Sequence, residues 1–196
     1  MDGAIGKPVR RKEDLRLLTG RGRFTDDFNQ PNKAHMVMVR SVHAHARLSA
    51  IHIDAAFAMP GVLAVLTGAD VLANKLNPVP HDPLPGGRND LKLCGRNGGP
   101  LFDGPHYFLP ADKARHVGEA VAAVIADTLA QAKDAAEVVE IDYETLPHVT
   151  GTSETVTDGA PAVWDEVPDN TPVDVVTGDR RAADALFETA EHVVRM

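Results

Sequence analysis

The 196-residue chain has a single cysteine, few aromatic residues and no long apolar run. With Cys94 alone it cannot form an internal disulfide, and it cannot by itself hold an iron–sulfur cluster or a structural zinc ion. The longest uncharged run, residues 55–69, is broken by Pro60 and Gly61 and is too short to span a bilayer. These absences exclude a disulfide-stapled domain and predict no membrane association.

A targeting signal is also missing from the start of the chain. Arg10 and Arg11 form a twin-arginine pair, but charged residues follow them where an export signal has an apolar stretch. We therefore expect a cytoplasmic protein.

Positive charge is scarce, because 20 Lys and Arg stand against 28 Asp and Glu, for a net charge of −8. This balance argues against a general nucleic-acid binder. The charge is unevenly placed: residues 1–50 carry +5 and residues 119–196 carry −13. Such asymmetry fits either two different partner surfaces or acidic loops that keep the C-terminal third solvated.

Apolar runs and turn residues predict an α+β domain with mixed sheet pairing, because the chain shows no long alternation of parallel βαβ units. We expect helices at 12–18, 55–59, 128–138 and 179–189. The predicted strands are 33–41, 46–54, 62–66, 106–109, 113–117, 119–126 and 140–143. The polar, acidic stretch 150–180 is interpreted as a linker.

Between the two halves lies a stretch without steady periodicity, residues 74–105. It contains six Pro and six Gly among 32 residues. A structureless loop of this length is unusual in a compact domain and is often functional, although a tolerated surface insertion has the same pattern.

Catalytic constellations are mostly absent. No glycine run has the spacing of a phosphate-cradling motif. His43 and His45, two residues apart on an extended segment, would point to one face and could ligate a metal, or could be hydrogen-bonding residues at a strand end. Glu119 enters a buried strand, where a carboxylate acts either as an acid or base or as a salt-bridged residue. Cys94, flanked by Lys92 and Arg96, has no evident His or Asn partner for nucleophilic chemistry.

Short motifs in a fixed order resemble a known family. Two long ones are the opening, with Arg10–Asp14 followed by 17–27, and the segment Val39–Ala46. The other motifs are Pro60–Val62, Thr67–Asp70, Val117–Ala122, Ala126–Thr128, Asp142–Pro147 and Gly178–Asp179. Together they are similar to the N-terminal part of the large, molybdenum-binding subunit of the xanthine dehydrogenase/aldehyde oxidase family. One departure is Ala120, where bacterial relatives usually have proline.

The resemblance implies an α/β hammerhead domain over residues 20–150, preceded by an N-terminal arm over residues 1–19. Residues 151–196 would be a linker and the start of a molybdenum-binding domain. The resemblance assigns no catalytic, cofactor-binding or metal-binding residue to this chain. Molybdopterin cytosine dinucleotide, [2Fe-2S] clusters and FAD would belong to partner domains or subunits: a molybdenum-binding one, an iron–sulfur one and an FAD one.

The implied activity is that of a molybdenum hydroxylase, which works only in the assembled enzyme. The alternatives are a stand-alone interaction or scaffold module of the same fold and, third, a small metal enzyme that uses His43 and His45. By its position in the family, Leu101-Phe102 resembles an apolar pair that lines the substrate funnel in some relatives. Apolar side chains there would exclude water and orient a flat substrate, whereas the other interpretation is that they anchor the loop in the core.

Overall fold

The computed structural model describes residues 6, 8–80, 93–94, 98–99, 101–175 and 178–194. Residues 1–34 and 35–196 are two separate compact units. The first unit contains one short helix, α1 (Asp14–Leu18), and one 3-10 turn (Thr25–Asp27) in its described part. Leu15, Leu18 and Phe24 are all exposed there, and the described part of this unit buries no apolar side chain.

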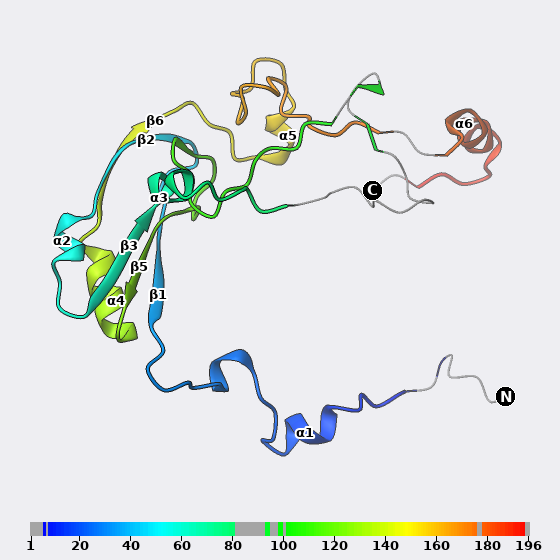
Figure 1. Cartoon of the computed structure of the whole chain (residues 1–196). Coiled ribbons are helices and arrows are strands. Elements are labelled where there is room, and N and C mark those ends of the chain that lie inside the picture. The colour runs from blue at the N-terminus through cyan, green and yellow to red at the C-terminus, as the bar shows by residue number, and fades with distance from the viewer. Residues whose placement is uncertain are drawn as a thin grey trace. The chain divides into compact units, whose positions relative to one another are not determined.

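In its described residues the second unit contains two three-stranded sheets, most of whose strands are labelled in Figure 1. One sheet has the strand order β1-β5-β3, and the other has the order β4-β2-β6. The strands are β1 (His35–Arg40), β2 (Ala46–His52), β3 (Val62–Thr67), β4 (Lys113–Ala114), β5 (Ala120–Ala126) and β6 (Glu140–Thr145). β5 is the central strand of the first sheet, and its Ala and Val residues are almost entirely buried.

Short helices connect these strands. α2 (Asp54–Phe57) lies between β2 and β3, α3 (Gly68–Ala73) follows β3, and α4 (Leu129–Glu137) joins β5 to β6. The Thr128 hydroxyl caps α4 by accepting from the Gln131 backbone N–H at 3.3 Å, as Ser and Thr do at helix starts. Later in the chain come α5 (Thr152–Thr155) and α6 (Arg180–Thr189), the latter capped by Asp179.

The core forms on both faces of the first sheet. On one face Val65 and Val124 pack against Ala56 of α2 and Ala135 of α4. On the other, Ala123 packs with Val71 of α3 and with Leu109. The small residues of α4 let this helix lie close to the sheet, in agreement with the stripe of small residues in its sequence.

The predicted α+β class is confirmed, but mixed sheet pairing is wrong: every strand pair that the structure describes is antiparallel. The reason is that α4 connects strands of different sheets and therefore creates no parallel neighbour. Residues 106–109 form no strand, and only the first two residues of 113–117 do. α3 was not predicted.

The stretch interpreted as a linker contains local structure. Besides α5, it has a bridge between Trp164 and Val167 and a left-handed residue at Asn170, with φ 53°. Within the ranges that the structure describes, no helix is both long enough and apolar enough to cross a bilayer.

Candidate functional site

A pocket of about 850 Å³ lies between the loop that precedes β5 and the segment around residues 155–173. Its apolar lining includes rings from Phe102, Tyr107, Pro110, Trp164 and Pro172. Aliphatic side chains complete it: Leu72, Leu109, Val163, Val167 and Val173. Its charged lining consists of Asp103, Asp112, Arg115, Glu119 and Glu166. The volume falls within the range of about 300–1,000 Å³ typical of small-molecule sites.

Trp164, the one tryptophan of the chain, joins the two walls of this pocket. The Arg115 guanidinium lies over its ring, 3.9 Å from the centroid. Phe102 meets the same ring edge-on, with centroids 5.4 Å apart and planes at 61°. Gly104 also lies against the indole, because a Cβ at this position would come 2.9 Å from Trp164 Cζ2. The indole is therefore held by three residues of the preceding loop.

Arg115 is itself held by the loop that carries it. Its Nη1 donates to the Lys113 carbonyl and its Nη2 to an Asp112 carboxylate oxygen, both at 3.3 Å. Its Nε is buried, and no hydrogen-bond partner is found for it in the described part of the chain. Two nitrogens of the guanidinium are thus already engaged in hydrogen bonds with neighbouring residues.

An ion pair joins the segment that carries Arg115 to the segment that carries Trp164. Lys113 Nζ donates to Asp165 Oδ2 at 2.8 Å. The hydrogen bond from Lys113, together with its charge, lowers the pKa of Asp165 below its ordinary value. Because the Asp165 side chain is 80% exposed, we assign this pair an orienting role beside Trp164 rather than a large stabilising one.

The Asn170 side chain cross-links the segment around residues 155–173, which forms one wall of the pocket. Its Oδ1 accepts from the Val163 N–H at 2.9 Å, and its Nδ2 donates to the carbonyls of Pro161 and Thr155 at 3.0 and 3.1 Å. One half-buried amide therefore closes the loop that presents Trp164.

We expect Asn170→Gly to loosen residues 151–175. Glycine keeps the left-handed backbone but loses the three amide bonds, so the segment should lose about 1–3 kcal/mol. Limited proteolysis measures the effect as faster cleavage in this segment. Asn170→Ala should destabilise the segment more than Asn170→Gly does, because a positive φ strains the backbone of alanine. Cleavage of the glycine variant at the wild-type rate would show that the amide does not hold the loop.

Glu119 lines the pocket but is engaged in its own turn. Its carboxylate accepts from the Arg115 backbone N–H at 2.5 Å and lies 3.6 Å from His116 Nδ1. The Glu119 backbone carbonyl accepts from Ser41 N–H. These contacts hold the turn into β5 and place Glu119 beside His116.

The histidine pair does not have the extended geometry that the sequence suggested, because residues 42–45 form bends rather than a strand. His45 is buried, with Nδ1 3.0 Å from the Pro147 carbonyl oxygen. His43 meets the ring of Tyr143 edge-on at 4.8 Å. In the described ranges no three His, Cys, Asp or Glu side chains gather as a metal site would require.

Two other residues singled out from the sequence do not line the pocket. Leu101 is half-buried beside Phe102, which does line it. Cys94 is half-buried, and its neighbours Lys92 and Arg96 fall outside the described residues.

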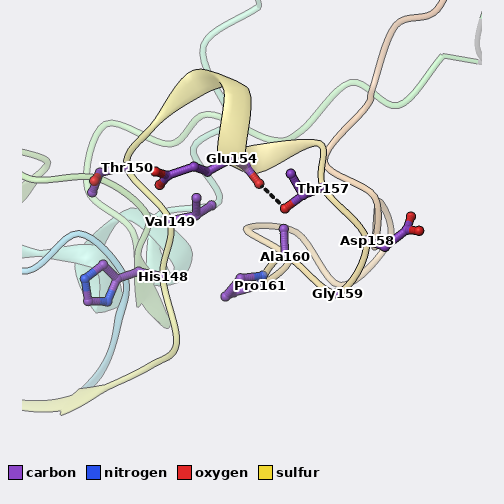
Figure 2. Close-up of a pocket in the computed structure, with 9 residues that line it drawn as sticks. All are labelled: His148, Val149, Thr150, Glu154, Thr157, Asp158, Gly159, Ala160 and Pro161. Atoms are coloured by element: carbon purple, nitrogen blue, oxygen red, sulfur yellow. Dashed lines mark hydrogen bonds between the residues drawn. The ribbon is translucent and has the colours of Figure 1, made fainter.

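A smaller, more polar pocket of about 330 Å³ follows β6. Figure 2 shows it enclosed by His148 to Thr150 on one side and by the turn Thr157 to Pro161 on the other. The Thr157 hydroxyl donates to the Glu154 carbonyl at 2.7 Å and so closes the turn. Its lining combines the apolar residues Val149, Ala160 and Pro161 with the carboxylates Glu154 and Asp158.

His52 provides a pH-dependent contact across β2 and β6. Its Nε2 lies 2.9 Å from Asp142 Oδ2, and this hydrogen bond, with the charge of Asp142, raises the pKa of His52 above 6.5. The pair therefore stabilises the fold below pH 6.5 and loses that contribution as the pH rises through the raised pKa.

We expect Asp142→Asn to lower the pKa of His52 in an NMR titration. An unchanged midpoint would contradict the pairing.

With this geometry established, comparison with known proteins gives the family. The family model described as "Aldehyde oxidase and xanthine dehydrogenase, a/b hammerhead domain" matches residues 19–85 and 87–147. The chain belongs to this family. The resemblance inferred from its motifs is confirmed, and so is the hammerhead fold.

Individual relatives agree with this assignment. The hammerhead chain is 36% identical to the nicotine 6-hydroxylase large subunit of Paenarthrobacter nicotinovorans, covering 97% of this chain and 21% of the relative. It also matches the crystal structure of quinoline 2-oxidoreductase from Pseudomonas putida 86, with TM-score 0.64 and 35% identity over 82% of this chain and 19% of that one. The structure of a Cu,Mo-CO dehydrogenase gives TM-score 0.66 and 30% identity over 94% of this chain and 22% of that one.

The hammerhead chain therefore spans about a fifth of the length of the nicotine 6-hydroxylase large subunit and of the carbon monoxide dehydrogenase large chain of Hydrogenophaga pseudoflava. The sequence motifs indicated the family, and the family resemblance pointed to Phe102. The sequence did not predict that Trp164, Arg115 and Asn170 belong to one site. The one indication of this site was a single tryptophan in a polar, acidic stretch.

Proposed function

We propose that this chain is the hammerhead part of a molybdenum hydroxylase, an oxidoreductase that is active only with its molybdopterin-binding and electron-transfer partners. The family match over residues 19–85 and 87–147 carries the proposal. The names of the relatives add support, because they are oxidoreductases described as large subunits or large chains.

In this proposal residues 20–150 form the hammerhead domain and residues 1–19 an arm. Residues 151–196 lead into a molybdenum-binding domain. The contacts of Trp164 with Phe102 and Arg115 support a first part of this segment that packs against the loop before β5.

On the family resemblance, we assign molybdopterin cytosine dinucleotide, the [2Fe-2S] clusters and FAD to partner domains or subunits.

The Leu101-Phe102 pair is proposed to border the passage that the substrate takes, with Phe102 lining the pocket and Leu101 beside it in the chain but outside the lining. Phe102 supports this role because it lines a large apolar pocket, where apolar walls displace water from a flat substrate and restrict its orientation. Phe102 also packs on Trp164, so anchoring the loop and lining the passage are compatible roles for one side chain.

Purification of the protein from its native host, with whatever subunits accompany it, tests the proposal. We expect molybdenum by elemental analysis, together with dye reduction driven by aldehydes or nitrogen heterocycles. Residues 1–196 expressed alone serve as the control and should show neither. A native complex without molybdenum and without dye reduction would instead support the interaction-module alternative.

A further inference from the structure

The basic segment, residues 9–24, differs in charge from the rest of the chain. It has six Lys and Arg against two Asp and Glu, a balance of +4, whereas residues 25–196 have 13 against 25, a balance of −12. A protein surface rich in carboxylates is attracted by the first charge balance and repelled by the second. The charge pattern therefore selects the basic segment as the place where an acidic partner would approach this chain.

Exposed apolar side chains accompany these charges. Val9, Leu15, Leu18 and Phe24 are 68–86% exposed, and none of the apolar side chains in the described residues up to 34 is buried. α1 has five residues, and so short a helix is not stable in water without packing against another surface. The basic segment thus needs an apolar surface from outside its own unit to become ordered.

Most cations of the basic segment are not engaged within their own unit. In the described part of this unit, Arg11 pairs with Asp14 at 3.5 Å, and Arg23 lies over the Phe28 ring, 5.6 Å from its centroid. Four other cations have no ion-pair partner among the residues that the structure describes: Arg10, Lys12, Arg16 and Arg21. Their guanidinium and ammonium groups can therefore bind carboxylates of another protein.

We propose that the basic segment docks on a protein surface of complementary character, one that presents carboxylates beside apolar side chains. The inference rests on the proposed function, because a partner subunit of the assembled enzyme would supply that surface. A lipid bilayer can also be anionic and apolar. An interfacial helix, however, buries a continuous apolar face along its length, which the five residues of α1 do not provide.

Trypsin cleavage after the Lys and Arg residues of the basic segment measures the docking, because proteolysis follows the population in which a segment is exposed. The complex purified from the native host is compared with residues 1–196 expressed alone. We expect cleavage within residues 9–24 to be at least about tenfold slower in the complex. The fast rate should return near about 1 M salt, where the Debye length falls to about 3 Å. A segment that is cleaved equally fast in the complex and in the lone chain would overturn the proposal.

Variants separate the charge from the apolar contacts. Arg16→Glu and Leu18→Ser should each restore cleavage at Arg21 and Arg23 in the complex, about tenfold faster than in the unsubstituted protein. Neither side chain is buried in the unit, so neither substitution removes a core contact. Arg180→Glu is the matched control, because Arg180 is 77% exposed on α6 and should leave the protection unchanged. Full protection in both variants would refute the docking.

Three other results would assign the basic segment to a different surface and so overturn the proposal. Slow cleavage of the lone chain at every concentration would mean that the segment is covered by its own chain. Protection that grows with the concentration of the lone chain would indicate a second copy. Protection by vesicles with about 30% phosphatidylserine, without any partner protein, would indicate a membrane.

The two proposals fail separately. A complex that contains molybdenum and reduces dye, but whose basic segment stays cleavable, would overturn the docking alone. Salt-sensitive protection in a complex that holds no molybdenum would support the docking and overturn the proposed function.

Discussion

Gly68→Ala should destabilise the protein by about 3 kcal/mol or more, which is the largest loss of stability that we expect for a single substitution. Gly68 is the buried first residue of α3, directly after β3. A Cβ there would lie 2.5 Å from the Pro110 carbonyl carbon and from Ala111 Cα, and closer still to the Pro110 carbonyl oxygen. These atoms belong to the backbone, so they cannot rotate away as a flexible side chain would.

The backbone at Pro110 and Ala111 is also constrained on both sides. Leu109 before it is buried in the core against Val71, and β4 begins two residues after it. Relief of the clash would therefore move a core residue or a strand. Denaturant unfolding monitored by circular dichroism measures the loss.

The control for this substitution is Gly118→Ala. Gly118 has φ 86° but open space around its Cβ position, so alanine there should cost only the strain of the backbone, about 1–2 kcal/mol. Equal midpoints for the two variants would mean that the close approach at Gly68 is relieved at little cost.

Ala135→Leu is expected to cost about 1–3 kcal/mol, because it forces a large side chain between α4 and the sheet. Ala135 has no exposed surface and packs with Val124 of β5 and Val65 of β3. The helix would have to move outward, and Ala56 of α2 lies in the same cluster.

Ala130→Leu is the matched control on the same helix. Ala130 is exposed, so the same substitution adds a side chain in solvent and should leave the unfolding midpoint nearly unchanged. A loss of stability as large as that of Ala135→Leu would show that helix propensity or solubility, rather than packing, dominates the effect.

The strands of the first sheet were predictable from the sequence because a strand that is buried in a sheet appears as a short apolar run. Residues 120–126 are apolar throughout, as expected for the central strand covered on both faces. The helix at 129–137 was equally clear from its cap and its small apolar residues. In contrast, α3 has six residues and begins with glycine, so neither length nor propensity favoured it. Its capping residues, Thr67 and Asp70, were the available signal.

The pocket could not be predicted in the same way, because it depends on contacts between distant parts of the chain. Phe102 was singled out by resemblance alone, and its partner Trp164 lies in a stretch whose composition is typical of a linker. Nothing in the local pattern couples the two residues. Likewise, the bends at residues 42–45 separate His43 from His45, although the alternation of residues suggested one shared face.

The strand pairing has a consequence for synthesis of the chain. In the described ranges, β1 and β3 pair only with β5, and β2 pairs only with β4 and β6. The three strands made first, up to Thr67, therefore have no strand partners until residues from Lys113 onward leave the ribosome. During that interval, apolar segments such as Val62–Thr67 stay unpaired, which is when non-native association is most favourable. A nascent chain stalled before Lys113 should therefore hold no sheet, and ribosome-associated chaperones should bind its first half.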